Sequence, residues 1–250
     1  MSLTAFITGA TSGIGKATAE LFAQNKIRLV LCGRRLERLK ELQKELEKIT
    51  DVTILQFDVR NKEAVFNAIK SLPESFKQID ILINNAGNAH GLSSIQDGDT
   101  DDWDAMLDIN VKGLLYVSKA IIPNMTERNS GFILNIGSIA GKEVYPNGNV
   151  YCASKYAVNA LNKGMRIDLN KHNIRVCAIH PGAVETEFSE VRFKGDKEKA
   201  KGVYSGYKAL QAADIADIIY FVVTRPYHVN IEDLIVYPTA QASATIMNKN

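Results

Sequence analysis

The turn that decides the fold reads Thr8-Gly9-Ala10-Thr11-Ser12-Gly13-Ile14-Gly15. It follows an apolar run, Ala5–Thr8, and leads into a segment with helical periodicity, Lys16–Gln24. Glycines allow the sharp bend and the close approach of the backbone that such a turn needs. Because the first amides of a helix attract an anion, the turn predicts a pyrophosphate site. Its spacing is TGxxxGxG and not the commoner GxGxxG, and a purely structural turn is the alternative.

Outward from this turn, short β-branched runs alternate with helical segments. The predicted strands are Ala5–Thr8, Arg28–Leu31, Val52–Phe57, Asp80–Ile83, Phe132–Ile136, Arg175–Ile179 and Leu234–Val236. The predicted helices are Lys16–Gln24, Leu36–Ile49, Lys62–Leu72, Trp103–Met125, Tyr151–Leu169 and Asp214–Thr224. Right-handed crossovers place helices on both faces of a parallel sheet, so we expect an α/β, doubly wound, Rossmann-type fold of about seven strands.

The chain has 250 residues and no internal linker, and we expect one domain over residues 1–250. Within segment 190–206, the stretch Arg192–Gly206 lacks a clear core pattern, and long loops of this kind often act as lids over a substrate. Residues 241–250 are expected to form a C-terminal tail that is either flexible or in contact with another subunit.

Composition narrows the range of partners and compartments. Lys and Arg number 30 against 28 for Asp and Glu, so nucleic acid is not an expected partner. Cys32, Cys152 and Cys177 are far apart, which predicts no zinc or other metal site and favours a reducing compartment. The sequence has no long apolar run and no basic leader, so we expect a cytoplasmic protein that does not bind a membrane.

Two arginines follow the second predicted strand, in the stretch Leu31-Cys32-Gly33-Arg34-Arg35. A site for NAD usually has an acidic residue there, which binds the ribose hydroxyls. A guanidinium group is always charged and its planar fork suits a phosphate, so Arg34, with Arg35 as a second candidate, predicts binding of the 2′-phosphate of NADP. Solvated charges at the start of a helix are the alternative, more so for Arg35 than for Arg34.

A tyrosine and a lysine lie one helical turn apart in the predicted helix Tyr151–Leu169. Tyr151 and Lys155 therefore emerge from the same face, where the ammonium group can stabilise a phenolate. Ser138 comes just after the fifth strand, where its hydroxyl can hold a substrate oxygen. Asn110, in the long fourth helix, is a candidate for a water relay.

These motifs, with Asn84-Asn85-Ala86-Gly87 and Pro181-Gly182, together resemble the short-chain dehydrogenase/reductase family over nearly the whole chain. The resemblance implies that Tyr151 is the acid-base group and that Ser138 donates to the substrate oxygen. It also implies that Lys155 binds ribose and tunes Tyr151, with Asn110 supporting a relay. The cofactor residues that it implies are Gly9, Thr11, Ser12, Gly13, Ile14, Gly15, Arg34, Arg35, Asp58, Val59, Asn85, Ala86, Gly87, Tyr151, Lys155, Pro181, Gly182, Val184 and Thr186.

The implied positions divide along the cofactor. Asp58 is expected near adenine, and Asn85 and Gly87 near the adenosine ribose. The nicotinamide amide is expected near Gly182, Val184 and Thr186. One departure matters: many NADP-preferring members have a basic residue where this chain has a serine, Ser12, so phosphate recognition must depend on the two arginines.

Two later stretches resemble one branch of the family, the NADP-dependent 3-hydroxy acid and serine dehydrogenases. These stretches are Glu187–Asp196 and Tyr237–Ser243. The branch includes L-allo-threonine dehydrogenases, malonic semialdehyde reductases and sulfoacetaldehyde reductases, whose short substrates carry an anionic group. We expect Arg192 to bind that anion, with an exposed loop charge as the alternative. The predicted substrate pocket consists of Ser138, Tyr145, Asn147, Gly148 and Arg192, although Tyr145 could equally be a core residue.

The sequence thus predicts an NADP-dependent oxidoreductase that moves a hydride between nicotinamide and a short 3-hydroxy acid or its semialdehyde. A broad-specificity or sulfoacetaldehyde-type carbonyl reductase is the first alternative. A catalytically silent NADP-binding regulatory protein is the second, and the four intact catalytic positions argue against it. The resemblance also implies a homotetramer with Trp103–Met125 and Tyr151–Leu169 between subunits, although an internal core is the other use of such apolar faces.

Overall fold

Strand β1 (Thr4–Thr8) lies inside a seven-stranded parallel sheet in the computed structural model of the protein, which describes residues 3–249. Residues 1, 2 and 250, at the ends of the predicted domain 1–250 and tail 241–250, lie outside the described residues. The strand order is β3-β2-β1-β4-β5-β6-β9, and each neighbouring pair is parallel. The remaining strands are β2 (Arg28–Gly33), β3 (Val52–Gln56), β4 (Ile81–Asn84), β5 (Gly131–Ile136), β6 (Ile174–Pro181) and β9 (Asp233–Val236). The predicted doubly wound α/β fold is confirmed.

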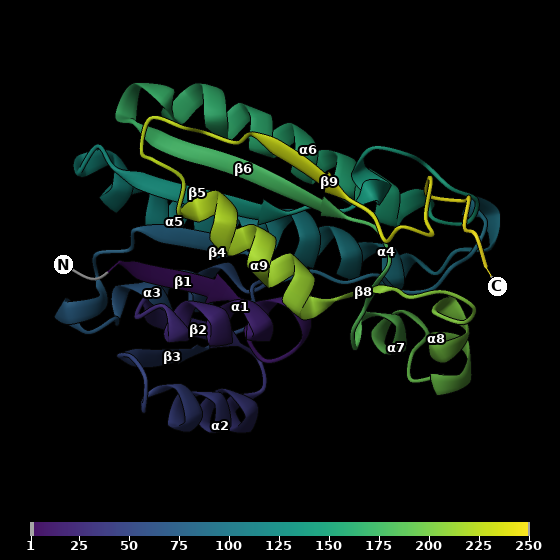
Figure 1. Ribbon diagram of the computed structural model, residues 1–250, viewed down its shortest axis with the longest axis horizontal. Helices are drawn as coiled ribbons and strands as arrows, with labels where there is room; N and C mark the ends of the chain where they lie inside the picture. The colour runs from purple at the N-terminus through teal and green to yellow at the C-terminus, as the bar shows by residue number, and fades with distance from the viewer. Residues whose placement is uncertain (1–2, 250) are drawn as a thin grey trace.

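The order of the strands reverses once, next to β1. The chain runs outward from β1 to β2 and β3, then returns to place β4 on the other side of β1. Helices cover both faces of the sheet (Figure 1). They are α1 (Gly13–Gln24), α2 (Leu36–Leu46), α3 (Lys62–Lys70), α4 (Thr100–Leu107), α5 (Leu114–Glu127), α6 (Asn149–Leu169) and α9 (Ala212–Val223). In an open α/β sheet this reversal leaves a crevice at the carboxyl ends of the strands, where ligands bind.

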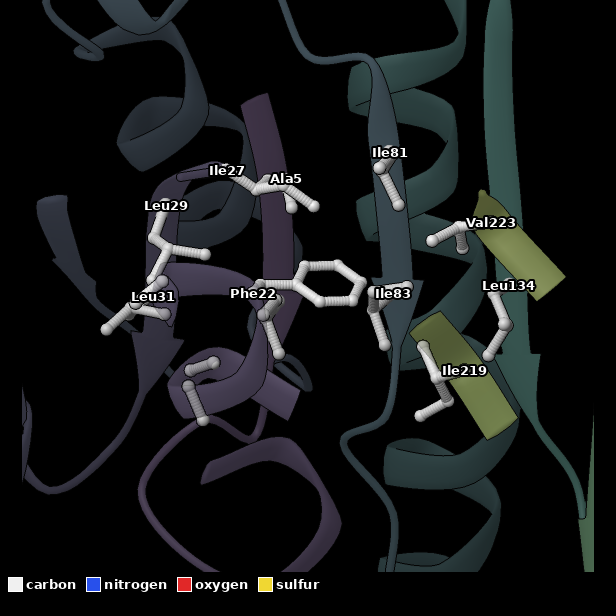
Figure 2. Packing of buried hydrophobic residues seen from close by; sticks show 14 of the residues in the cluster. Ala5, Phe22, Ile27, Leu29, Leu31, Ile81, Ile83, Leu134, Ile219 and Val223 are labelled. Atoms are coloured by element: carbon white, nitrogen blue, oxygen red, sulfur yellow. The ribbon is translucent and has the colours of Figure 1, made fainter. Parts of the chain in front are cut away.

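Alternate residues of the buried strands supply two separate cores, one on each face of the sheet. Odd-numbered positions of β1, Ala5 and Ile7, join the core formed by α1 and α9, whereas Phe6 joins the core on the α3, α5 and α6 side. Figure 2 shows part of the first core, in which the fully buried Phe22 of α1 and Ile219 of α9 join the side chains of the strands. Successive side chains of a strand point to opposite faces of the sheet, and helices cover both faces. Both sets of side chains are therefore buried, which is why the strands are apolar throughout.

The predicted continuous helix Trp103–Met125 is wrong in its middle. The structure has α4, then a π-helical turn at Asp108–Gly113, and then α5. A π turn adds a residue to one helical turn and displaces the side chains there, and such turns are frequent at functional sites. Apolar periodicity does not reveal one extra residue, and Asn110 lies within this turn.

The segment between β6 and α9 contains more structure than its sequence pattern indicated. It holds β7 (Val184–Glu185), α7 (Phe188–Arg192), α8 (Lys197–Val203) and β8 (Leu210–Gln211), with β7 and β8 paired as a small parallel sheet. Figure 1 shows α7 and α8 beyond the carboxyl ends of the large sheet. Within residues 3–249, no helix has both the length and the apolarity needed to cross a membrane.

Candidate active site

A cavity of about 600 Å³ opens at the carboxyl ends of the central strands. Three of the predicted substrate residues, Ser138, Tyr145 and Arg192, lie on its wall. Every predicted cofactor residue except Gly15 also lines it, namely Gly9, Thr11, Ser12, Gly13, Ile14, Arg34, Arg35, Asp58, Val59, Asn85, Ala86, Gly87, Tyr151, Lys155, Pro181, Gly182, Val184 and Thr186. The fold thus brings the residues singled out along the chain to one site.

The glycine-rich loop at the start of α1 is shaped to receive an anion. Gly9 and Gly13 have φ angles of +64° and +51°, which side chains disfavour. At Gly15 an added Cβ would lie 2.4 Å from the Gly9 carbonyl oxygen, so this glycine packs behind the loop and not on the cavity wall. The first turn of α1 carries no acidic residue, and among residues 3–249 no side chain caps its amides. These amides are therefore available to a phosphate, which fits a dinucleotide.

The Asn85 side chain holds this loop against the end of β4. Its Nδ2 donates to the carbonyl oxygens of Thr8, at 2.9 Å, and Gly9, at 3.2 Å. The hydroxyl of Thr8 in turn accepts hydrogen bonds from the amides of Asn85 and Ala86. The resemblance placed Asn85 near the ribose, and the structure adds that its amide group is engaged with the loop.

The two arginines after β2 differ in their contacts. Arg35 Nη2 donates to Thr11 Oγ1 at 2.9 Å and to Ser12 Oγ at 2.8 Å, and its Nη1 lies 2.8 Å from a carboxylate oxygen of Glu187. The Arg34 side chain is 60% exposed, and its nearest acidic partner, Asp58, is 3.8 Å away. Arg35 is thus committed to the loop and to α7, while Arg34 is the better placed of the two to receive a 2′-phosphate.

The carboxylate of Asp58, on the cavity wall, stays ionised. Burial raises its pKa, but hydrogen bonds from Arg60, with Nη2 at 2.7 Å, and the charges of Arg60 and Arg34 outweigh burial and lower the pKa overall. A charged carboxylate is an acceptor for amino and hydroxyl groups, which suits its predicted place near adenine.

Tyr151 and Ser138 lie together at the other end of the cavity. Tyr151, near the start of α6, is 8% exposed, and burial raises the pKa of its phenol above the ordinary value, opposed by the Ser138 hydroxyl and the Arg192 charge. Ser138 follows β5, and its Oγ accepts a hydrogen bond from the Ala140 amide at 3.1 Å. The Tyr151 phenol is therefore protonated at neutral pH and can act first as a proton donor.

Lys155 is buried one turn further along α6. Its Nζ donates to the Ile136 carbonyl at 3.0 Å, and burial lowers its pKa to about 8, so the ammonium form still predominates at pH 7. Gly87 separates Lys155 from Asn110, since an added Cβ would lie 3.4 Å from Nζ and 3.0 Å from Asn110 Oδ1. Asn110 is buried behind the cavity wall and binds the backbone amide and carbonyl of Asn88. This amide holds the loop after β4 in place.

Comparison with known proteins identifies the chain. Residues 3–197 match the short chain dehydrogenase family. The chain belongs to this family. It is 44% identical over 239 residues to the NADP-dependent 3-hydroxy acid dehydrogenase of Salmonella typhi, covering 95% of this chain and 96% of that protein. It is also 44% identical to sulfoacetaldehyde reductase 2 of Chromohalobacter salexigens over 243 residues, which is 97% of this chain and 96% of that protein.

A solved structure agrees with this membership of the short-chain dehydrogenases. The closed form of serine dehydrogenase complexed with NADP⁺ superposes with a TM-score of 0.93 at 42% sequence identity, covering 98% of both chains. The family resemblance inferred from the motifs is therefore confirmed, and so is the branch to which the later stretches pointed.

In this dehydrogenase Arg192 of α7 lies against Tyr151. Its Cζ is 5.6 Å from the ring centres of both Tyr145 and Tyr151. Nη2 donates to the Tyr145 hydroxyl at 3.0 Å, and Nε donates to the Gly91 carbonyl at 3.3 Å. These bonds orient the guanidinium fork, and within residues 3–249 they leave Nη1 for another acceptor. Arg192 is thus not a free loop charge.

Two predicted substrate residues do not line the large cavity. Asn147 and Gly148 instead border a small cavity of about 20 Å³, which shares Tyr151 and Arg192 with the large one. Asn147 has a φ of +63°, and a Cβ on Gly148 would lie 2.2 Å from the Tyr145 ring. The two residues make the tight turn that lets the Tyr145 ring pack, and so they shape the pocket indirectly.

Two further residues at the cavity wall, Glu187 and Gln241, have no role predicted from the sequence. Glu187 at the start of α7 binds Arg35 and, at 2.7 Å, Arg38, and these bonds lower its pKa although burial raises it. Gln241 Oε1 accepts from the Ala183 amide at 2.9 Å, which places the tail on the cavity. Both residues lie in the stretches that resemble the 3-hydroxy acid branch, and that likeness was the available signal.

Proposed function

We propose that this chain is an NADP-dependent dehydrogenase of short 3-hydroxy acids, of the serine, allo-threonine or 3-hydroxypropionate type, and of the corresponding semialdehydes. The observation that carries the proposal is an oriented guanidinium group, that of Arg192, 5.6 Å from the ring centre of the buried Tyr151. If Arg192 binds the carboxylate of a 3-hydroxy acid, the C3 carbon of that acid, two bonds from the carboxyl carbon, lies beside the Tyr151 phenol. The relatives' names point to the same substrate class.

NADP is held by three features of this chain. The loop Gly9–Gly15 and the amides of α1 receive the pyrophosphate, and Arg34 binds the 2′-phosphate. Lys155 and the loop after β6, with Gly182, Val184 and Thr186, hold the nicotinamide end. When bound, the nicotinamide ring supplies or accepts the hydride.

Three side chains then act on the substrate, and two more support them. In reduction, the Ser138 hydroxyl holds the carbonyl oxygen and the Tyr151 phenol gives it a proton; in oxidation the proton returns. The ammonium of Lys155 stabilises the phenolate that remains. Arg192 binds the substrate anion, and segment 190–206, which contains α8 and the end of α7, acts as the lid that excludes water. Asn110 acts through the Asn88 backbone as support for a proton relay.

A panel of substrates tests this function. NADPH oxidation is followed at its absorbance band with 3-carbon semialdehydes, sulfoacetaldehyde and uncharged aldehydes of equal length, and NADP⁺ reduction with serine, allo-threonine and 3-hydroxypropionate. We expect the anionic substrates to be preferred. Equal turnover of uncharged aldehydes would indicate a broad carbonyl reductase, and turnover of none would favour a silent NADP-binding protein.

Two variants examine the assigned roles separately. Tyr151→Phe removes the proton donor and should lower kcat by about 100-fold or more with NADPH binding retained. Arg192→Ala should raise KM for anionic substrates by about 10-fold or more, since a charge-assisted bond is lost, and should hardly affect uncharged aldehydes. Equal losses on both substrate types would contradict the anion-binding role of Arg192.

Sulfoacetaldehyde reduction is the second candidate activity. A guanidinium fork binds a sulfonate as it binds a carboxylate, and one relative is named for this activity. The ratio of kcat/KM for sulfoacetaldehyde to that for malonic semialdehyde decides between the two.

We also propose that the protein is a cytoplasmic homotetramer. The three cysteines are free and buried, which suits a reducing compartment. Apolar side chains on the helices expected between subunits are exposed, among them Leu115 at 38% and Ile167 at 69%. Exposed apolar surface of this kind supports association. Light scattering of the purified protein tests the assembly.

A further inference from the structure

A buried histidine lies behind the backbone of Ser138 and has no part in the mechanism given above. His180, the second-last residue of β6, is completely buried. Its ring packs against Gly137, where an added Cβ would be 2.3 Å from Nδ1. Only a glycine at position 137 leaves room for the imidazole, so β5 and β6 are matched to each other at this point.

Both nitrogens of the imidazole face hydrogen-bond acceptors. Nδ1 is 3.2 Å from the carbonyl oxygen of Ser138, and Nε2 is 3.5 Å from Oδ1 of Asp233. The other carboxylate oxygen of Asp233 is bound by Lys142, whose Nζ also donates to Asn159 at 3.1 Å. The side chains of Lys142 and Asp233 thus close the site around Nε2.

A neutral imidazole has one N–H and can serve only one of these acceptors. Burial lowers the pKa of His180 to about 4, with Asp233 opposing and Lys142 and Lys155 assisting, so the ring is neutral at pH 7. The distance of 3.2 Å to the Ser138 carbonyl lies at the edge of the hydrogen-bond range, whereas among residues 3–249 Nε2 has no hydrogen-bond partner. The proton therefore belongs on Nδ1.

The carbonyl of Ser138 begins the short turn that sets the direction of its own hydroxyl. The carbonyl oxygen accepts one hydrogen bond from the Gly141 amide, at 2.8 Å, and one from the imidazole. Both lone pairs of the oxygen are then used. The same turn presents the Ala140 amide to Ser138 Oγ at 3.1 Å. With that lone pair occupied, the hydroxyl proton is free to point into the cavity.

We propose that His180 is a positioning residue for Ser138: its Nδ1–H fixes the Ser138 carbonyl, and the Lys142–Asp233 pair keeps the imidazole in this tautomer. The lysine does so by taking up the negative charge of Asp233, which would otherwise attract the ring proton to Nε2. The kinetic consequence rests on the proposed function of the site, whereas the tautomer does not depend on turnover.

The tautomer is tested directly by NMR. In ¹⁵N-histidine-labelled protein at pH 7, multiple-bond ¹H–¹⁵N spectra distinguish a protonated Nδ1 from a protonated Nε2, and His180→Leu identifies the signal. We expect a protonated Nδ1, and a shift of the proton toward Nε2 in Lys142→Met. A protonated Nε2 in the parent protein would overturn the proposal whether or not any substrate is turned over.

Kinetics test the effect on Ser138 with the preferred substrate of the panel. His180→Leu keeps the volume but loses the donor, and we expect kcat to fall about 10-fold, the equivalent of one net hydrogen bond, with the Kd of NADPH unchanged. The primary isotope effect with 4-deuterated NADPH should rise, because hydride transfer becomes slower. His180→Asn, whose Nδ2 reaches the place of Nδ1, should recover kcat to within about threefold of the parent.

Asn230→Ala is the matched control. Asn230 binds the backbone amide and carbonyl of Val176, at 3.1 and 3.2 Å, and so anchors the opposite end of β6. The Asn230→Ala substitution should lower Tm and leave kcat and the isotope effect unchanged. If it lowers kcat as much as His180→Leu does, general loosening of β6 explains the effect and the proposal is wrong. A His180→Leu enzyme with the parent's kcat and isotope effect contradicts it equally.

Discussion

Replacing Arg34 by Asp is the sharpest perturbation of the cofactor site. Arg35 is engaged with Thr11, Ser12 and Glu187, so of the two arginines after β2 Arg34 is the one that we propose to bind the 2′-phosphate. The substitution removes that cation and adds a carboxylate close to Asp58. A carboxylate at the end of the second strand is also what a site for NAD uses to bind the ribose hydroxyls. The variant should therefore shift the preference from NADPH toward NADH.

The size of the effect follows from the contact that is lost. A hydrogen bond to a charged group contributes about 1.5–3 kcal/mol, which corresponds to about 10- to 150-fold in kcat/KM for NADPH. The Arg34 side chain is 60% exposed, so solvent screening favours the lower part of this range. Repulsion between the new carboxylate and the phosphate acts in the other direction. We expect a loss of about 30-fold for NADPH and less than about threefold for NADH, which has no phosphate to lose.

Initial-rate kinetics with both cofactors, at low and at high salt, measure this ratio. Lys40→Asp makes the same change of charge on an exposed residue of α2 that does not line the cavity, and it should leave the ratio unchanged. Arg34→Asp should also show a weaker dependence of NADPH binding on salt than the parent does. An NADPH-to-NADH ratio within about threefold of the parent would show that Arg34 does not read the phosphate.

Three further predictions concern stability. Phe22→Ala empties a fully buried site beside Tyr220, and denaturation in urea should show a loss of about 3–5 kcal/mol; a loss below about 1 kcal/mol would mean that the core collapses around it. The Asn61 side chain caps α3 by accepting a hydrogen bond from the Ala64 amide at 3.0 Å. Asn61→Ala should therefore lower the free energy of unfolding by about 1 kcal/mol, with Asn61→Asp as the conservative control. His180 is protonated near pH 6.5 in the unfolded chain but only near pH 4 in the native state, so the free energy of unfolding decreases as the pH is lowered from 6.5 to 4. His180→Leu should lack this component of about 1.4 kcal/mol per pH unit. An unaltered slope in the variant argues against a neutral buried ring.

Local sequence predicted the elements that depend on periodicity and on backbone chemistry. The alternation of buried strands and amphipathic helices is visible in the chain, because each element must bury one face or both. The glycine-rich turn and the Tyr151–Lys155 pair were recognisable because their geometry is set within a single turn of backbone. Each of these features depends on neighbours close in sequence.

The errors have a different cause. The long helix was predicted as continuous because an apolar pattern does not show the π turn at Asp108–Gly113, where Asn110 binds the backbone of Asn88, 22 residues earlier. At this place a contact across the fold is stronger than the local preference for a continuous helix. The turn at Asn147 and Gly148 is different, because the ring that packs on it, that of Tyr145, lies only three residues earlier.

The sequence by itself determined that this chain forms a doubly wound sheet with a glycine-rich turn after the first strand and a tyrosine and a lysine on one helical face, since these depend on period and spacing. Only the tertiary structure decided how the arginines are used. Arg35 meets Glu187 from 152 residues away, which leaves Arg34 exposed, and Arg192 reaches Gly91 across 101 residues to lie over Tyr151. A charged side chain has several partners within reach along the chain, and its choice depends on which of them folding brings close and shields from water.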